Sequence, residues 1–181
     1  MMSYPNTKTP LENRDTWQTP RDLFQALNAE FHFQLDAAAS DRNALCKRFI
    51  TAEENTLEAD WSSYVTSGYA WLNPPYSDPS PFIEKTAREK ELNHVGCVML
   101  LPADTSVGWF KSAIGSASEV RFITGGRLSF VSSLTGKPVN GNNKGSMLII
   151  WHPWPTNHCQ FSTVDRNQLL AYGKRLMERA A

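Results

Sequence analysis

The sequence predicts one three-layer α/β domain whose sheet is mostly parallel and carries an antiparallel edge hairpin. Three observations predict this class. Strand-like and helix-like segments alternate between residues 16 and 115. Residues 95–102, VGCVMLLP, are almost all apolar, as expected of a strand that is buried on both faces. From residue 119 to residue 152, strand-like segments follow one another with no helix between them, which favours an antiparallel pair.

The composition is that of a globular protein without an overall charge bias. Of 181 residues, 41% are hydrophobic and 20% are charged, and 18 basic residues balance 18 acidic ones. An anionic partner would therefore have to meet a local basic patch. Cys46, Cys97 and Cys159 form no CxxC motif and predict reduced thiols in a cytoplasmic protein. We see no secretory signal and no apolar run near the roughly 20 residues of a membrane span.

The first half of the chain predicts two helices and two strands. Residues 1–15 are polar and turn-rich, so we expect a flexible arm before a single domain at 16–181. Residues 19–31, TPRDLFQALNAEF, predict a helix with Thr19 as its cap, Pro20 in its first position and Asp22 completing a capping box. Residues 31–36 alternate in polarity and predict a short strand. We expect a helix at 40–49, a loop that could hold a short strand at 53–61, and a strand at 68–73.

The second half predicts a buried strand, three helices and the antiparallel pair. Helices are expected at 79–93 and at 106–115, the latter ending at Gly115 in the C-cap position. Residues 119–124, 127–131 and 146–152 are strand-like, and the turn-rich residues 132–145 between the last two predict a hairpin connection. Residues 165–181 predict a closing helix, with Asp165 and Gln168 as a capping box.

The segment WLNPPYSDPSPF, residues 71–82, is the strongest candidate for a functional site. Proline cannot continue a sheet, so Pro74 and Pro75 end the preceding strand in a rigid step. The carboxyl edge of a parallel sheet is where α/β proteins bind ligands. There the Asn73 amide oxygen and the Pro74 carbonyl could accept the two hydrogens of an exocyclic amine while Tyr76 stacks on its ring. A stiff junction without chemistry is the plain alternative.

An ordered set of motifs makes this reading specific. TWQTPRDLF, FQLDAAAS, NTLEADW, WLNPPYS, LLPADTSVGWF, GGRLSF and KGSMLIIWHP follow one another from residue 16 to residue 153. This set resembles the phage and prophage DNA N6-adenine methyltransferases of the Dam type. The resemblance implies a Rossmann-like fold, S-adenosylmethionine as cofactor, and a catalytic segment Asn73–Pro74–Pro75–Tyr76 that acts on an adenine flipped out of double-stranded DNA in the cytoplasm of a bacterial host. Methylation of an RNA base or a protein glutamine, and an inactive DNA-binding module, remain the alternatives.

The same resemblance assigns the cofactor residues. Trp17, Thr19 and Pro20 match the motif near the methionine end, and Asp36 with Ala37 matches the first cofactor loop, where Asp36 would face the methionine ammonium. Here alanines replace the usual glycine-rich turn. Asp60 and Trp61 match the position beside the cofactor adenine, and Glu53 or Glu54 could bind its ribose. Thr19 and Asp36 could instead be capping residues, and Trp61 could be core.

Target and DNA contacts are expected further along the chain. Phe130 matches an aromatic near the flipped base, although it could also be core, and Asp104 either lines the target pocket or caps the following helix. The connection Ser132–Gly145 is longer than a hairpin needs and has no acidic residue, so we expect it to contact DNA through Lys137, Asn140, Asn142, Asn143 and Lys144. A plain surface loop is the alternative. We expect no metal, because His152, His158 and Cys159 fit no zinc pattern.

Overall fold

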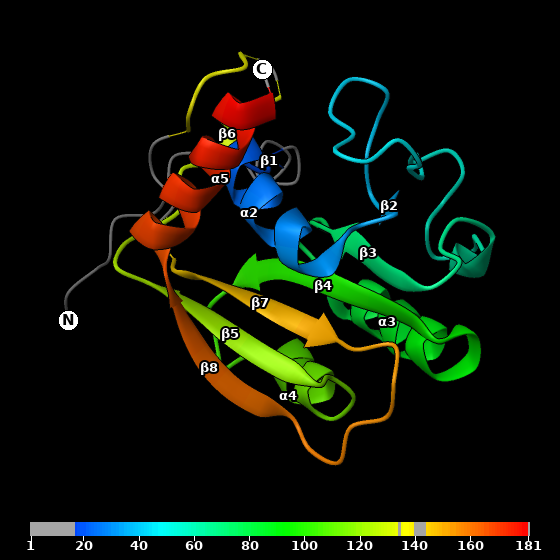
Figure 1. Cartoon of the computed structure of the whole chain (residues 1–181). Coiled ribbons are helices and arrows are strands. Elements are labelled where there is room, and N and C mark those ends of the chain that lie inside the picture. Colours follow the sequence, from blue (N-terminus) through cyan, green and yellow to red (C-terminus); the bar gives the residue numbers. More distant parts are fainter. Residues whose placement is uncertain (1–16, 134, 140–143, 181) are drawn as a thin grey trace.

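The computed structural model describes residues 17–133, 135–139 and 144–180. The predicted amino-terminal arm, residues 1–15, therefore lies outside the described residues. A six-stranded sheet forms the centre of the molecule (Figure 1). Its strands, in spatial order, are β2 Leu35–Asp36, β3 Gly68–Leu72, β4 Val95–Pro102, β7 Ser146–Trp151, β5 Glu119–Thr124 and β8 Gln160–Asp165.

The sheet is mostly parallel, as predicted, but its reversed strand is internal. β2, β3 and β4 pair in parallel, and so do β5 and β8, whereas β7 is antiparallel to both β4 and β5. The antiparallel hairpin that we predicted between residues 127–131 and 146–152 is wrong, because β7 pairs with β4 and β5 instead. The antiparallel strand does not lie at the edge either, because β8, which the sequence did not predict, pairs with β5 and takes the edge.

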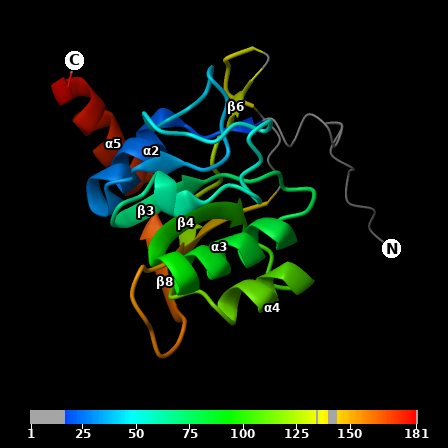
Figure 2. The same cartoon turned by 90° about the vertical axis from the view of Figure 1, so that its right-hand side faces the viewer.

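Helices cover both faces of the sheet and confirm the three-layer prediction (Figures 1 and 2). α3 (Ser80–Asn93) and α4 (Gly108–Ile114) lie on one face, and α2 (Arg21–Phe31) and α5 (Arg166–Ala180) lie on the other. β4 contributes side chains to the hydrophobic cores on both faces of the sheet. Cys97, Met99 and Leu101 face one core, and Val98 and Leu100 face the other. This double burial explains why residues 95–102 are nearly all apolar.

α2 and α5 cross in direct contact because Gly173 has no side chain. A Cβ atom at this position would collide with the backbone carbonyl of Asp22. The close crossing holds α5 against the first turn of α2. The two helices therefore form one unit beside the carboxyl edge of the sheet (Figure 1).

A second, two-stranded sheet replaces part of the predicted pattern. Residues 127–130 form no strand, and only β6 (Val131–Ser132) is extended and paired, with β1 (Trp17–Gln18) as its antiparallel partner. Ser132–Gly145 is therefore not a hairpin connection between two strands of the main sheet. Instead, residues 125–145 connect β5 to β7 and pass β1 on the way.

Three local predictions near the amino terminus are wrong in detail. Pro20 occupies the cap position of α2, and Thr19 makes no capping hydrogen bond, so the predicted capping box does not form. The short strand is limited to β2, because His32 adopts a left-handed conformation with φ 53°. Residues 40–49 form turns and no helix. The amide of Asn43 accepts the backbone N–H of Ser40, a local bond that competes with helix formation. No helix within the described ranges is long and apolar enough to cross a membrane.

Candidate active site

Three parallel strands deliver the predicted site residues to one edge of the sheet. β2, β3 and β4 end at Asp36, Leu72 and Pro102, and Asp36 lies beside Trp71 in the register of β2 and β3. Asn73 follows β3 directly. The carboxylate and the start of the proline segment are therefore neighbours, although 37 positions separate them in the chain (73 − 36).

The side chain of Asn73 is held by the amino-terminal strand. Its Nδ2 donates a hydrogen bond to the backbone carbonyl of Trp17 at 3.2 Å. This bond uses the donor end of the amide, so the Oδ1 acceptor points elsewhere. None of the described side chains or backbone groups donates to that oxygen. The arrangement leaves an oriented acceptor at the end of β3, next to the carbonyl of the buried Pro74.

Three aromatic rings from distant parts of the chain meet behind this segment. Phe130 stacks on Trp17 with ring centroids 5.6 Å apart, and it meets Tyr76 edge to face at 6.0 Å. Phe130 is 1% exposed, so it supports Tyr76 from within the core. The Tyr76 hydroxyl is buried and has no hydrogen-bond partner among the described residues, and this burial raises its pKa well above the usual value.

A cavity of about 530 Å³ opens beside Asn73 and Pro75. Its wall includes Ala37, Ala38 and Ala39, the alanines that stand in place of a glycine-rich turn. Small side chains let a ligand come close to this loop. The remaining lining residues are Trp17, Ser40, Asn43, Ile50, Thr51, Ala52, Asn55, Thr56, Phe82 and Ser133. A narrow recess, which shares Trp17, Ala38, Asn43 and Asn73 with the cavity, continues to Thr19 and Asp36.

Asp36 is a buried carboxylate at the wall of this recess. It is 3% exposed, and its Oδ2 accepts the backbone N–H of Leu45 at 3.0 Å. Burial raises the pKa of Asp36 from 3.8 to about 6, although the backbone N–H groups of Leu45 and Ala38 favour the charged form. No cationic side chain of the described residues forms an ion pair with it. A positively charged group of a ligand would supply the missing partner.

The predicted adenine contacts lie away from the cavity. Trp61 is fully buried, and its indole N–H donates to the backbone carbonyl and the hydroxyl of Thr56 at 3.2 and 3.0 Å. Asp60 is exposed and caps the short helix η1 (Trp61–Ser63) through the backbone N–H of Ser62. Glu53 and Glu54 do not line the cavity either. The structure therefore favours the core reading of Trp61 and a capping role for Asp60.

The cavity wall instead contains polar residues that sequence reasoning missed. Asn55 and Thr56 line it, and Thr56 is the residue that anchors the Trp61 indole. Asn55 has φ 55°, a left-handed conformation that asparagine adopts more readily than most residues. Asn55, an asparagine in a turn a few residues before Asp60 and Trp61, was the feature of the sequence that could have revealed this part of the cavity.

Asp104 and the connection to β7 are joined by an ion pair. Lys144 Nζ lies 2.7 Å from Asp104 Oδ2, and the Ser106 hydroxyl and backbone N–H bond to Oδ1. The Lys144 bond, followed by those from Ser106, lowers the pKa of Asp104 to about 2. α4 begins only at Gly108, so Asp104 does not cap it, and it lines none of the cavities beside Asn73.

The other predicted DNA contacts fall partly outside the described residues. Asn140, Asn142 and Asn143 lie there, whereas Lys137 is exposed on the surface. His152, from the segment considered for zinc binding, accepts or donates a 2.7 Å hydrogen bond with the Tyr69 hydroxyl. Within the described ranges, no three His, Cys, Asp or Glu side chains are placed to hold a metal ion.

Comparison with known proteins now decides the family. A family model described as DNA N-6-adenine-methyltransferase (Dam) matches residues 6–176. The chain belongs to this family. A DNA N-6-adenine-methyltransferase of Haemophilus phage HP1 is 39% identical over 155 residues, which is 84% of this chain and 86% of the relative. One of Escherichia phage T1 is 40% identical over 162 residues, covering 81% and 66%.

Family membership confirms the resemblance inferred from the motifs, and the α/β sheet is consistent with a methyltransferase fold. A shorter match involves a putative methyltransferase, YfdM, of Escherichia coli K12. It is 42% identical over 65 residues, which is 34% of this chain and 71% of the relative.

Proposed function

We propose that this protein transfers a methyl group from S-adenosylmethionine to the exocyclic N6 amine of an adenine in double-stranded DNA. Membership of the DNA N-6-adenine-methyltransferase family supports the reaction class. The observation that carries the proposal is the Asn73 amide. Its donor end is occupied by the Trp17 carbonyl, so its acceptor end is oriented for an incoming amine at the mouth of the cavity.

The residues of the cavity suit the proposed cofactor. A volume of about 530 Å³ lies within the range typical of small-molecule sites. S-adenosylmethionine would supply a methyl group made electrophilic by its positive sulfur. Asp36 would meet the ammonium of its methionine end, while Thr19 and Trp17 line the same recess. Asn55, Thr56 and Ile50 offer polar and apolar contacts for the adenosine end, in place of Asp60 and Trp61.

The proline segment would position the target amine. Asn73 Oδ1 and the Pro74 carbonyl oxygen each accept one hydrogen bond from the target amine. The lone pair of the amine nitrogen is then directed at the methyl group of the cofactor. Tyr76 provides the stacking surface, backed by Phe130. Adenine must leave the duplex to reach this pocket at a cost of a few kcal/mol, and stacking returns about 1–3 kcal/mol. Catalysis then consists mainly of alignment.

We further infer that residues 16–181 act as one catalytic domain in the cytoplasm of a bacterial host, where bacterial and phage DNA are accessible. This inference is supported by the phage relatives and by the one six-stranded sheet at the centre of the described residues.

The decisive experiment removes the Asn73 acceptor. In Asn73→Ala, the rate of methyl transfer should fall by about 100-fold or more, the scale seen when one aligned hydrogen-bonding group is lost from an active site. Cofactor affinity should remain close to that of the parent. Mass spectrometry of DNA from expressing cells measures N6-methyladenine, and calorimetry measures cofactor binding.

Asn93→Ala, at an exposed position on α3, is the matched control and should retain activity. N6-methyladenine that persists in DNA from cells with Asn73→Ala would overturn the assignment of Asn73. Methylated RNA or protein glutamine, without methylated DNA in cells with the parent enzyme, would redirect the proposal to another amine.

A further inference from the structure

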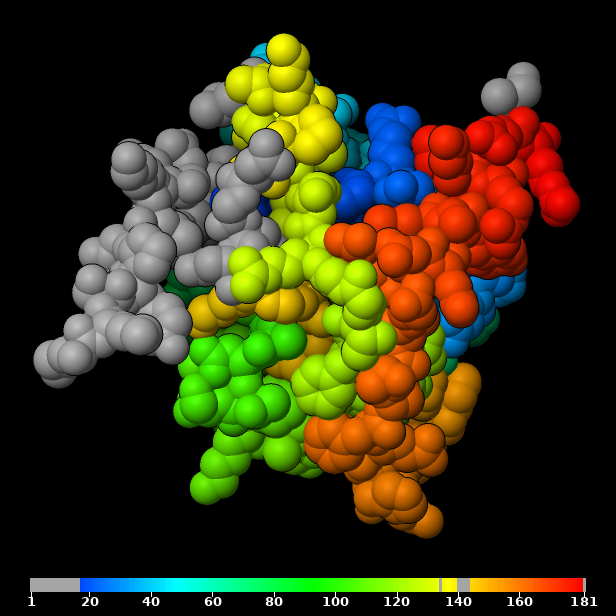
Figure 3. Space-filling view, turned by 90° about the vertical axis from the view of Figure 1, so that its left-hand side faces the viewer, coloured from blue at the N-terminus to red at the C-terminus, as the bar shows by residue number. Residues whose placement is uncertain are grey.

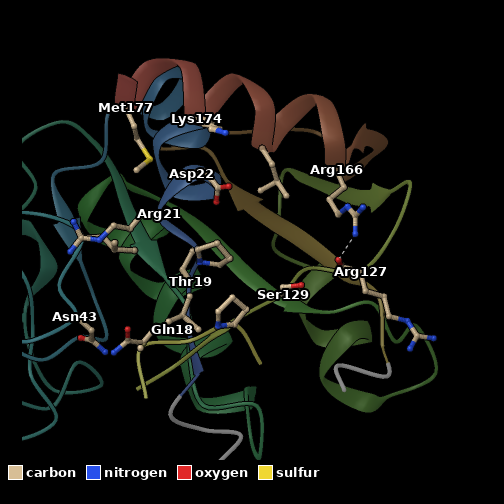
Figure 4. A pocket seen from close by; sticks show the side chains of 16 residues that line it. Gln18, Thr19, Arg21, Asp22, Asn43, Arg127, Ser129, Arg166, Lys174 and Met177 are labelled. Carbon is tan, nitrogen blue, oxygen red and sulfur yellow. Dashed lines mark hydrogen bonds between the residues drawn. The ribbon is translucent and has the colours of Figure 1, made fainter. Parts of the chain in front are cut away.

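A second hollow, about 640 Å³ in volume, lies on the carboxyl-edge side of the molecule and is rich in basic residues. It is bounded by the start of α2, by α5 and by the segment 127–138 (Figure 4). Figure 3 shows these parts side by side on one face, with the blue residues of β1 and α2 between the yellow segment and the red helix. Four cationic side chains line this basic groove: Arg21, Arg127, Arg166 and Lys174.

The groove concentrates positive charge in a chain with no net charge. Among the described residues, Asp22 is the one acidic residue that lines it, and Asp22 Oδ1 accepts the neighbouring backbone N–H of Leu23. Arg21 and Lys174 are exposed, and no carboxylate of the described residues forms an ion pair with either. The positive charge of these two side chains is therefore available to an anionic partner.

Arg166 is held in a fixed position in the groove. Its guanidinium donates to the backbone carbonyl of Arg127 at 2.7 Å, as Figure 4 shows, and to Asn167 Oδ1 at 2.8 Å. Both acceptors are neutral, and no carboxylate of the described residues forms an ion pair with this guanidinium. The bond to Arg127 ties the start of the segment 127–138 to the first turn of α5.

The basic groove adjoins the candidate active site. Gln18, Thr19, Asn43 and Leu45 line both this groove and the narrow recess that contains Asp36 and Asn73. A polymer that lies in the groove would thus pass beside the place where the target amine is bound.

The spacing of the cations fits a chain of negative charges better than one anion. Arg166 and Lys174 are eight residues apart on α5, which corresponds to about 12 Å along the helix axis. One strand of DNA carries a phosphate about every 3.4 Å of helix axis, so this distance spans several phosphates. Arg21 lies at the start of α2, which packs against α5.

We propose that this basic groove binds the phosphate backbone of the DNA duplex beside the target adenine. The inference rests on the proposed function and adds the surface that holds its substrate. Arg21 and Lys174 contact phosphates directly. Arg166 also contacts a phosphate while its hydrogen bond to the Arg127 carbonyl holds the wall of the groove in place. Gly136 and Pro138 line the groove together with Val131, and these two residues belong to the connection Ser132–Gly145 that we expected to bind DNA.

The test compares two variants of equal charge change. Arg21→Gln/Lys174→Gln removes two cations from the groove, and Arg175→Gln/Arg179→Gln removes two from α5 that do not line it. Affinity for a short DNA duplex is measured by fluorescence anisotropy as a function of salt concentration. Each lost phosphate contact should reduce the salt slope by about 0.9, so the groove variant should lose about 1.8. Its affinity should fall about 30-fold at about 0.15 M salt, which is about 5.5-fold per contact for two contacts.

Three further readouts separate DNA binding from a structural role. The groove variant should keep the thermal midpoint and the cofactor affinity of the parent. Its loss of affinity should be equal on duplexes of unrelated sequence, because phosphate contacts carry no base information. The charge-conserving variant Arg21→Lys/Lys174→Arg should restore the salt slope.

Two negative results have different meanings. If the parent methylates DNA but Arg21→Gln/Lys174→Gln has the salt slope of the parent, the groove inference is wrong and the enzymatic function stands. The groove inference is equally wrong if Arg175→Gln/Arg179→Gln lowers the slope by the same amount. If the parent neither binds nor methylates DNA, the proposed function fails as well.

Discussion

Replacing Asp36 with asparagine should uncouple both stability and cofactor binding from pH. Asp36 is buried without a cationic partner among the described residues, and its pKa rises from 3.8 to about 6 on folding. A carboxyl group with a raised pKa favours the folded state while it is protonated. Its contribution is therefore fully present below about pH 4 and is lost as pH rises through about 6.

The size of the effect follows from this shift. A change of about 2 pKa units corresponds to about 3 kcal/mol, since each unit is worth 1.36 kcal/mol. Between about pH 4 and pH 7, the cofactor-free parent should lose up to about 3 kcal/mol of stability relative to Asp36→Asn. For a domain of this size, that is about 6–12 °C in thermal midpoint. Thermal unfolding of both proteins across this pH range measures it.

Cofactor binding should change in the opposite direction with pH. The ammonium of the ligand requires ionised Asp36, and a pKa of about 6 leaves only about a tenth of it ionised at about pH 5. Affinity of the parent for S-adenosylhomocysteine, which carries the same ammonium, should therefore fall about tenfold between about pH 7.5 and pH 5. Asp36→Asn should bind weakly at both pH values. Equal affinity in parent and variant, with the same pH dependence, would refute the role of Asp36.

Two predictions concern stability. Tyr76→Phe removes a buried hydroxyl that has no partner among the described residues, so it should raise the free energy of unfolding by up to about 1–3 kcal/mol. Tyr69→Phe, which loses a bond to His152, should lower it by about 1 kcal/mol. Urea titration of both variants measures this, and a destabilised Tyr76→Phe would show that the hydroxyl is satisfied. Gly173→Ala should cost about 1–3 kcal/mol or more because its Cβ atom collides with Asp22, whereas Gly108→Ala, where no atom lies within 4 Å, should be neutral. Equal midpoints for the two alanine variants would contradict the close crossing of α2 and α5.

Local patterns predicted the parts of the fold whose structure is decided locally. The apolar run of β4 and the proline segment after β3 could be read directly from the sequence. The helix at 40–49 was wrong because the Asn43 side chain bonds to the backbone of Ser40, and helical periodicity does not register such bonds. β8 was missed because an edge strand without a buried residue owes its structure to pairing with β5, far away in sequence.

The functional site could be predicted where a sequence motif fixes the backbone, as at Asn73. It was harder to predict where side-chain packing decides whether a residue contacts a ligand or belongs to the core. A buried indole and an indole that stacks on a ligand look alike in sequence, and only the hydrogen bonds to Thr56 place Trp61 in the core. The basic groove could not be predicted, because folding brings Arg21, Arg127 and Lys174 together from distant segments of a chain without a charge cluster.

The reversed strand in the middle of the sheet has a consequence for synthesis. β4 and β5 have no direct pairing, and β7, which joins them, is made after both. β7 begins about 45 residues after the end of β4, so at about 5–20 residues per second the ribosome releases it roughly 2–9 s later. Until then the nascent chain carries an apolar, unpaired edge on β4, next to the strands that hold the proline segment. An edge of this kind pairs readily with other chains, so the interval before β7 emerges is when this enzyme is most exposed to aggregation.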